Sequence, residues 1–262
     1  MKIVVCIKQV PDTTEVKLDP VTGTLIREGV PSIINPDDKA ALEAALKIKD
    51  KDGSHVTAIT MGPQQADVAL REALAMGVDE AILLSDRVFG GSDTWATSSA
   101  LAGAIKKLDY DLIIAGRQAI DGDTAQVGSQ IAEHLGIPQV SYVEGIELEG
   151  DTLVLKRQFE DRYQIIEAQT PLLLTALSEL NTPRYMRVGG VFDAYRTKEV
   201  QNWTYEDVKD TVEMENLGLK GSPTKVKKSF TKAVKPAGEV FEVSADEAVE
   251  LIINKLESKF II

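Results

Sequence analysis

The stretch DLIIAGRQAIDGDTAQVGSQIAEHLG (111–136) decides the fold. It opens with a short apolar run rich in isoleucine (111–116) and closes with an amphipathic pattern of helical spacing. The polar segment that joins them, GRQAIDGDTAQVG (116–128), carries two aspartates, Asp121 and Asp123, on either side of a glycine. A buried strand that leads through a loop into a helix is the repeating unit of a parallel α/β sheet.

The same alternation of strands and helices precedes this stretch. Apolar, β-branched runs typical of buried strands occur at 2–10, 54–62 and 80–86, with a further one at 171–177. A helical pattern begins at Pro36, with Asn35 as its expected N-cap, and others follow Pro63 and the loop that ends at Thr94. The segment 16–29 has the turn residues of a hairpin. This order predicts a Rossmann-like α/β fold in which helices cover both faces of a parallel sheet.

The pattern changes from about residue 138. Several segments with alternating polar and apolar residues predict an antiparallel extension of the sheet. After Leu180 the hydrophobic density falls, and the chain up to about residue 230 shows no core face of its own, so it is either disordered or lies against another surface. Ser244 and Glu247 form a capping box before an amphipathic C-terminal helix. A long arm that ends in such a helix favours a permanent partner chain, with folding back onto its own domain as the alternative.

The composition excludes several classes of function. The 262 residues carry a formal net charge of −12, which disfavours a nucleic-acid-binding surface, and no apolar run is long enough to span a bilayer. The N-terminal apolar stretch lacks the features of a signal peptide, so we expect a cytoplasmic protein. Cys6 is the only cysteine, which excludes an intramolecular disulfide and a Cys-ligated iron–sulfur cluster, and two distant histidines disfavour a zinc site. Redox chemistry in this chain would therefore require a bound cofactor.

Open parallel sheets bind ligands outside the carboxyl ends of their strands, in the loops that enter the helices. In this sequence the corresponding loops are Lys8–Pro11, Met61–Pro63, Ser85–Thr94 and Gly116–Val127. Their glycines allow a ligand to approach the backbone closely, although ordinary turn glycines would give the same pattern. Their spacing does not match the Gly-x-Gly-x-x-Gly fingerprint of the usual dinucleotide site.

Asp121 and Asp123 admit three interpretations. Two carboxylates are too few for a metal site, and alternate residues of a glycine turn can point in different directions, which disfavours an acid–base pair. The third interpretation uses the backbone, because the N–H groups around Thr124–Val127 begin a helix and favour an anion. Asp123 or Thr124 would then be the N-cap, and a plain helix cap without a ligand is the alternative. On geometry we expect a phosphate pocket.

Seven segments of the sequence together form a recognisable pattern. They are KQVPDT (8–13), IINPDD (33–38), ITMGPQQA (59–66), REALAMG (71–77), GRQAIDGDTAQVG (116–128), LKRQFEDRYQIIEAQTPLLLTA (155–176) and NTPRY (181–185). In this order they resemble the β subunit of electron-transferring flavoproteins over nearly the whole chain. The resemblance implies a domain of the adenine nucleotide alpha hydrolase-like type at 1–183. It also implies a C-terminal arm and helix at 184–262 that pack on an α subunit in a heterodimer.

The resemblance further implies where a cofactor binds. Ordinary family members hold AMP structurally in the β subunit, and the redox FAD belongs mainly to the α subunit. The family's nucleotide contacts correspond here to Cys6, Asn35, Asp38, Met61, Gly62, Gly116, Arg117, Gln118, Ala119, Ile120, Asp121, Gly122, Asp123, Thr124, Ala125, Gln126 and Val127. No side chain is implied to be catalytic and no metal is implied, because the flavin carries the chemistry.

A subgroup of the family from anaerobes replaces AMP with a second FAD, which accepts a hydride from NADH and splits the electron pair. One electron goes to ferredoxin or flavodoxin, and the other passes through the FAD of the α subunit to a dehydrogenase. The segments at 8–20, 85–98 and 118–128 are similar to those of this subgroup, which implies an electron-bifurcating, NADH-dependent flavin oxidoreductase complex. The residues expected near NADH are Phe89, Gly90, Gly91, Asp93 and Thr94, unless they form an ordinary surface loop.

The segment Asn181–Val200 resembles the family's partner-recognition loop but is less basic than in many members. The partner therefore stays open among an acyl-CoA dehydrogenase such as butyryl-CoA dehydrogenase, a caffeyl-CoA reductase and a lactate dehydrogenase. Two alternatives to the bifurcating subunit also stay open. One is a non-bifurcating β subunit with structural AMP, and the other is a stand-alone ATP-binding, stress-type domain that needs no α subunit.

Overall fold

The structure is a computed structural model that describes residues 1–12, 31–150, 152–227 and 238–262. The hairpin expected at 16–29 lies outside these residues. The chain divides into two compact units, Met1–Lys228 and Ser229–Ile262. The bounds implied by the resemblance, a nucleotide domain at 1–183 and an arm and helix at 184–262, stay a prediction.

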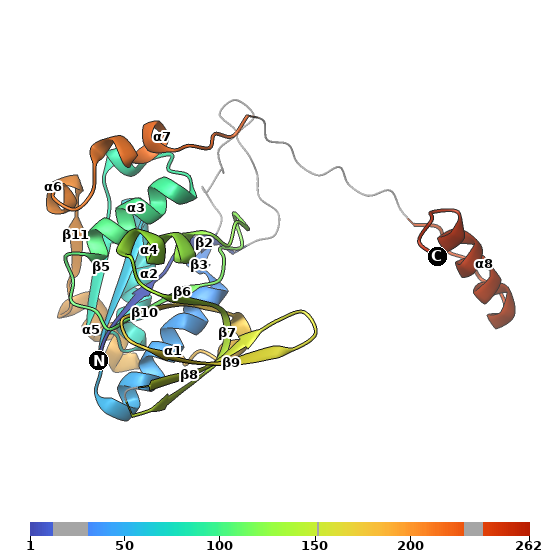
Figure 1. The fold of residues 1–262 in the computed structure, drawn as a ribbon, viewed down its shortest axis with the longest axis horizontal. Helices are drawn as coiled ribbons and strands as arrows, with labels where there is room; N and C mark the ends of the chain where they lie inside the picture. The colour runs from blue at the N-terminus through green and yellow to red at the C-terminus, as the bar shows by residue number, and fades with distance from the viewer. Residues whose placement is uncertain (13–30, 151, 228–237) are drawn as a thin grey trace. The chain divides into compact units, whose positions relative to one another are not determined.

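The described part of the first unit is built around a nine-stranded sheet (Figure 1). In spatial order its strands are β11 (Val200–Trp203), β5 (Glu80–Leu84), β4 (His55–Met61), β1 (Lys2–Cys6), β6 (Leu112–Gly116), β10 (Leu172–Ala176), β7 (Gln139–Glu149), β8 (Thr152–Gln158) and β9 (Tyr163–Gln169). Pairing is parallel from β11 to β7 and antiparallel from β7 to β9. The predicted parallel α/β sheet and its antiparallel extension are both confirmed. A separate pair consists of β2 (Gln9–Pro11) and β3 (Ser32–Ile34).

Helices cover both faces of the parallel strands (Figure 1), as predicted. On one face lie α1 (Pro36–Asp52), α2 (Asp67–Met76) and α5 (Val188–Arg196), and on the other lie α3 (Thr94–Ile105) and α4 (Val127–Leu135). Each face has its own buried cluster. Because successive side chains of a strand point to opposite faces, Val5 packs in the first cluster, whereas Val4 and Cys6 pack in the second.

The helix boundaries follow the local signals in the sequence. Pro36 occupies the first turn of α1, where its missing N–H costs nothing, and Gly53 ends that helix in the left-handed conformation (φ 74°). Gly77 ends α2, and Gly136 (φ 66°) ends α4. Short 3₁₀ turns occur at η1 (Gln64–Ala66), η2 (Arg87–Phe89) and η3 (Ser178–Leu180).

The segment after Leu180 has more structure than its composition suggested. Helix α5 packs on α2, and β11 adds an edge strand beside β5, so this part of the chain folds back onto its own domain. α6 (Tyr205–Val208), η4 (Met214–Asn216) and α7 (Gly218–Gly221) follow. The sequence did not predict these elements because only isolated residues of this segment are buried, among them Ala194, Val208 and Leu217. Such sparse anchors show no periodicity.

In the second unit, α8 (Ala245–Glu257) begins with the predicted capping box. The Ser244 N–H donates to Glu247 Oε2 (3.0 Å), and the Ser244 hydroxyl also donates to this carboxylate (2.7 Å). Val249, Ile252 and Ile253 are exposed within this unit.

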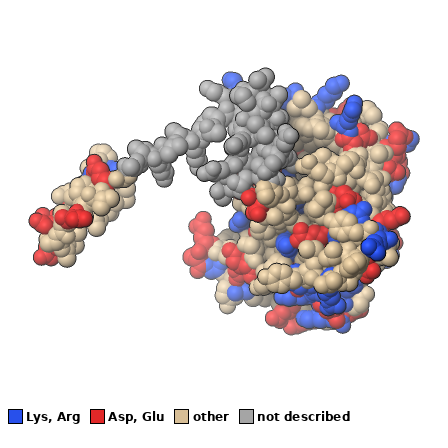
Figure 2. Space-filling view, turned by 180° about the vertical axis from the view of Figure 1, so that it is seen from behind, with Lys and Arg blue, Asp and Glu red and all other residues tan. Residues whose placement is uncertain are grey.

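Charged side chains of both signs intermingle on the face of the first unit that Figure 2 shows. The described residues include exposed ion pairs, such as Lys2 with Asp109 (2.6 Å) and Lys107 with Asp210 (2.6 Å). Exposed pairs add little to stability because water and salt screen them. Because side chains of the two signs are mixed, the acidic residues form no single patch on that face.

Candidate functional site

The carboxyl ends of the parallel strands form the edge at which the predicted loops meet. From β1 the chain runs outward through β4 to β5 and then crosses to β6, on the other side of β1. The strand order reverses between β1 and β6, which is where open α/β sheets bind ligands. The loops after β1, β4, β5 and β6 all leave from this edge, so the structure brings the four predicted loops to one side of the sheet.

Asp38, in the first turn of α1, joins two of these loops at the reversal point. Its Oδ2 accepts a hydrogen bond from the N–H of Lys8 (2.8 Å), and its Oδ1 accepts one from the N–H of Gly116 (3.0 Å). A Cβ at Gly116 would collide with Oδ1 and lie 2.7 Å from the backbone nitrogen of Asp38, so this approach requires glycine. Burial raises the pKa of Asp38 to about 7, against the opposing effect of the N–H donors.

Asn35 precedes α1, but its side chain does not cap that helix as the sequence suggested. Instead its Nδ2 donates to the carbonyl of Gln118 (2.8 Å), and its Oδ1 accepts from the N–H of Ile120 (3.0 Å). Asn35 is completely buried, so these bonds also satisfy its own amide. This residue fastens the loop after β6 to the start of α1.

Asp121 and Asp123 have different partners. The Oδ1 of Asp121 accepts from Lys8 Nζ at 2.7 Å, and its side chain is only 6% exposed. Asp123 is exposed and accepts from Gln118 Nε2 at 2.8 Å. Each carboxylate therefore holds the loop through a contact of its own.

Arg117 turns toward α1. Its Nε lies 3.4 Å from Oδ2 of Asp37, and the Oδ1 of Asp37 accepts from the N–H of Ser178 (3.1 Å). Burial raises the pKa of Asp37, and the charge of Arg117 partly offsets this effect. The pair links the start of α1 to the ends of β6 and β10, and one third of the Arg117 side chain stays exposed.

The stretch that leads into α4 differs from the expected helix start. α4 begins at Val127, its N-cap position is Gln126, and no side chain caps it, so Asp123 and Thr124 are not N-caps. Asp123 and Ala125 both have φ of 52°, a left-handed conformation that is uncommon for residues other than glycine. These two residues keep the chain out of the helical conformation and delay the start of the helix.

This geometry leaves backbone donors free. Within the part of the chain that the structure describes, the N–H groups of Thr124, Ala125, Gln126 and Val127 donate to no protein acceptor. Four consecutive free donors that end at a helix N-terminus match the requirements of a bound phosphate. Left-handed residues held against their preference are concentrated at functional sites.

The ends of β1 and β4 contribute little reactive chemistry. Cys6 is buried in the cluster under α3 and α4, and burial raises its pKa to about 12, so the thiol is not a nucleophile at neutral pH. Met61 packs partly against the same cluster. The N–H of Gly62 donates to the carbonyl of Leu84 (3.1 Å), which ties the loop after β4 to the end of β5.

The loop after β5 approaches the loop after β6. Thr94 Oγ1 donates to Gln126 Oε1 at 2.9 Å, so one of the residues expected near NADH is joined to the loop after β6. Phe89 is buried in the core, Gly90 and Gly91 are exposed, and the Oδ1 of Asp93 accepts from the N–H of Ala96 (3.0 Å) as the N-cap of α3.

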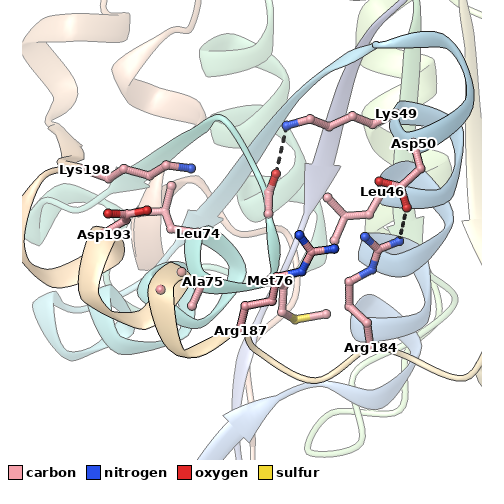
Figure 3. A pocket seen from close by; sticks show the side chains of 13 residues that line it. Leu46, Lys49, Asp50, Leu74, Ala75, Met76, Arg184, Arg187, Asp193 and Lys198 are labelled. Carbon is pink, nitrogen blue, oxygen red and sulfur yellow. Dashed lines mark hydrogen bonds and ion pairs between the residues drawn. The ribbon is translucent and has the colours of Figure 1, made fainter.

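A depression lies at the opposite, amino-terminal edge of the sheet (Figure 3). It has a volume of about 520 Å³, between the last turns of α1 and α2 and the start of α5, and its basic side chains are Lys49, Arg184, Arg187 and Lys198. Arg184 already pairs with Glu43 (2.9 Å) and Asp50 (2.7 Å). The sequence showed no sign of this depression, because its residues come from separate helices and share no motif.

Among the described residues, no three His, Cys, Asp or Glu side chains cluster in a way that could hold a metal ion. None of the helices in the described part of the chain has the length and apolar character needed to cross a membrane.

Comparison with known proteins gives one consistent result. Residues 22–208 match the family model of the electron transfer flavoprotein domain. The chain is 63% identical, over 99% of both sequences, to the electron transfer flavoprotein subunit beta of Clostridium acetobutylicum. It is 57% identical over the full length of both to subunit CarD of the caffeyl-CoA reductase-Etf complex of Acetobacterium woodii. It is 49% identical, again over the full length of both, to the acryloyl-CoA reductase electron transfer subunit gamma of Anaerotignum propionicum. The chain belongs to the electron transfer flavoprotein family, among its beta subunits.

Proposed function

We propose that this beta subunit binds an adenine nucleotide at the carboxyl edge of β1, β4, β5 and β6, and that the nucleotide is the FAD of an electron-bifurcating complex. The observation that carries the nucleotide site is the run of four N–H groups from Thr124 to Val127, which donate to no acceptor among the described residues. They lie in a loop that Asn35, Asp38 and Lys8 hold in place. A phosphate group is the ligand that such donors fit best.

Different residues of this edge would have different roles in binding. The amides of Thr124–Val127 would hold the phosphates, and the exposed glycines after β5 would leave room for NADH. FAD, when bound, supplies the acceptance of an electron pair from NADH and its release as single electrons. The chain's own contribution would be to bind, orient and shield that group, because at the described edge the Cys6 thiol is buried and the carboxylates of Asp121 and Asp123 are engaged by Lys8 and Gln118.

The proposal of bifurcation rests on the resemblance and on the names of the relatives. Two of them are subunits of complexes with CoA-linked reductases, caffeyl-CoA reductase and acryloyl-CoA reductase. By analogy, the chain would work in the cytoplasm as a heterodimer with an alpha subunit, with its C-terminal helix packed on that subunit. NADH would be the electron donor and ferredoxin or flavodoxin one acceptor. A dehydrogenase that contacts Asn181–Val200 would be the other.

The nucleotide content of the purified heterodimer tests the choice of cofactor. Two FAD molecules per heterodimer, together with NADH oxidation that depends on both ferredoxin and a CoA-linked acceptor, are the expected result. One FAD and one AMP would show a non-bifurcating beta subunit instead. A chain that is isolated without an alpha subunit and is loaded with ATP would support the stress-type domain.

A charge change tests the phosphate site itself. Gln126→Glu keeps an oxygen that can accept from Thr94 but places a negative charge beside the free amides, so we expect AMP and FAD to bind about tenfold more weakly. Gln130→Glu, one turn farther along α4, is the matched control and should change the affinity much less. Equal effects of the two variants, measured by calorimetric titration, would contradict the assignment of the site.

A further inference from the structure

Two segments that are far apart in the sequence are fastened to each other at Asp93. Its Oδ2 accepts hydrogen bonds from both the N–H (2.9 Å) and the hydroxyl (2.7 Å) of Thr224. The N–H of Asp93 donates to Ser222 Oγ at 2.8 Å. The segment Leu217–Thr224, called the strap below, therefore lies against the loop after β5.

The rest of the strap fits this loop closely. The N–H of Leu219 donates to the carbonyl of Gly90 (3.1 Å). A Cβ on Gly91, whose φ is 74°, would lie 3.1 Å from the Cβ of Leu219, and a Cβ on Gly218 would collide with the carbonyl of Val88. Gly91 of the loop and Gly218 of the strap therefore have a packing cause within the chain, besides any ligand that approaches them.

The second oxygen of Asp93 has a different task. Oδ1 accepts from the N–H of Ala96 and caps α3, and the next residue, Thr94, donates to Gln126 beside the free amides. The carboxylate of Asp93 thus connects the strap with the first turn of α3, and the adjacent Thr94 extends this connection to the loop after β6.

We propose that Asp93 is a positioning residue of the nucleotide site rather than a contact of NADH. By holding the strap, it fixes the conformation of Gly90–Thr94 and, through Thr94, the place of Gln126. This inference rests on the proposed nucleotide site for its functional part, whereas the latch between Asp93 and Thr224 stands by itself.

The substitution Asp93→Asn separates the two tasks of the carboxylate. An asparagine keeps an oxygen for the N–H of Ala96, and it places an NH₂ group opposite the two donors of Thr224. In hydrogen-exchange mass spectrometry of the full-length chain, we expect the amides of the strap to exchange at least tenfold faster, because a bond to a charged acceptor is lost. The first turn of α3 should keep its protection.

A second variant and a control distinguish a local effect on the strap from a general loss of stability. Thr224→Val removes only the hydroxyl donor, and it should accelerate exchange in the strap by a smaller factor. Asp86→Asn changes another acid of the same loop, one that accepts from Val88 and Tyr205 but does not contact the strap. This control should leave exchange in the strap at the wild-type rate.

Binding of AMP and of FAD to the same proteins tests the positioning role. Asp93→Asn should weaken both ligands about tenfold, and Asp86→Asn should not. Wild-type exchange rates in the strap of Asp93→Asn would overturn the latch, and a loosened strap with unchanged affinity would overturn the positioning role. If the wild-type chain bound neither nucleotide, the proposed function would fail, while the exchange data would still decide the latch.

Discussion

Replacing Gly116 by alanine should destabilise the protein far more than the same change at Gly122, six residues along the same loop. At Gly116 the new Cβ would collide with Oδ1 of Asp38. It would also lie 2.7 Å from the backbone nitrogen of Asp38 and 2.8 Å from the carbonyl carbon of Asp37. Two of these three atoms are backbone, so no side-chain rotation can relieve the overlap.

The loss of stability in Gly116→Ala can be estimated from the groups that must move to make room for the new Cβ. The first turn of α1 has to shift away from β6, which strains a close-packed region by about 1–3 kcal/mol. The shift also breaks or lengthens the bonds from the N–H groups of Gly116 and Lys8 to Asp38, and a bond to a charged group contributes about 1.5–3 kcal/mol. We therefore expect a loss of about 3–5 kcal/mol in the free energy of unfolding, a large part of the stability of an ordinary domain.

Gly122 provides the matched control, because a Cβ at this position meets nothing within 4 Å and the residue does not have a positive φ. Gly122→Ala should change stability by less than about 0.5 kcal/mol. Urea denaturation of the two full-length variants, followed by circular dichroism, measures both values. Equal midpoints for the two variants would show that the packing of α1 against the end of β6 is not as described here.

Three further changes test other contacts of the first unit. Lys8→Met removes the cation beside the nearly buried Asp121, so it should cost about 1–3 kcal/mol in urea denaturation, whereas Lys8→Arg should recover most of the loss. Gly190→Ala pushes a Cβ into a carbonyl of α2 and should accelerate hydrogen exchange in α5, whereas Gly189→Ala, in open space, should not. The pKa of Asp38 rises from its ordinary 3.8 to about 7, so the folded state keeps a proton that the unfolded chain has lost between these values. The free energy of unfolding should therefore fall by up to about 1.4 kcal/mol per pH unit as the pH rises through this window, and a slope that persists in Asp38→Asn would refute the assignment.

The sheet and its helices could be predicted because their signals are local. A run such as LLLTA (172–176) is apolar throughout, which is typical of a strand buried on both faces, and Pro36 and Gly53 mark the two ends of α1 within the sequence itself. The same applies to the capping box at Ser244. Such features depend on residues within one or two turns, so one sequence is enough to find them.

The details of the site depend on residues that are distant in the sequence. Asn35 was expected to cap α1, but its amide binds a loop 83 residues later, at Gln118. The helix before Gly136 was expected to begin near Asp123, but left-handed residues at Asp123 and Ala125 delay it to Val127. Neither the distant partner nor the sign of φ is encoded in a local pattern, so the location of the site could be predicted and its construction could not.

The way in which the loops are held has a consequence for binding. Asn35 and Asp38, at the start of α1, hold the loop after β6, and Asp93 holds the loop after β5 to the strap. All of these contacts are hydrogen bonds within the chain. The free amides of Thr124–Val127 are therefore already arranged before any ligand arrives, and a ligand would spend little free energy on ordering them. If an anchor is removed, the loop must be ordered by the ligand itself. The loss of affinity should then appear mainly as faster release of the nucleotide, since variants of one site differ more in dissociation than in association.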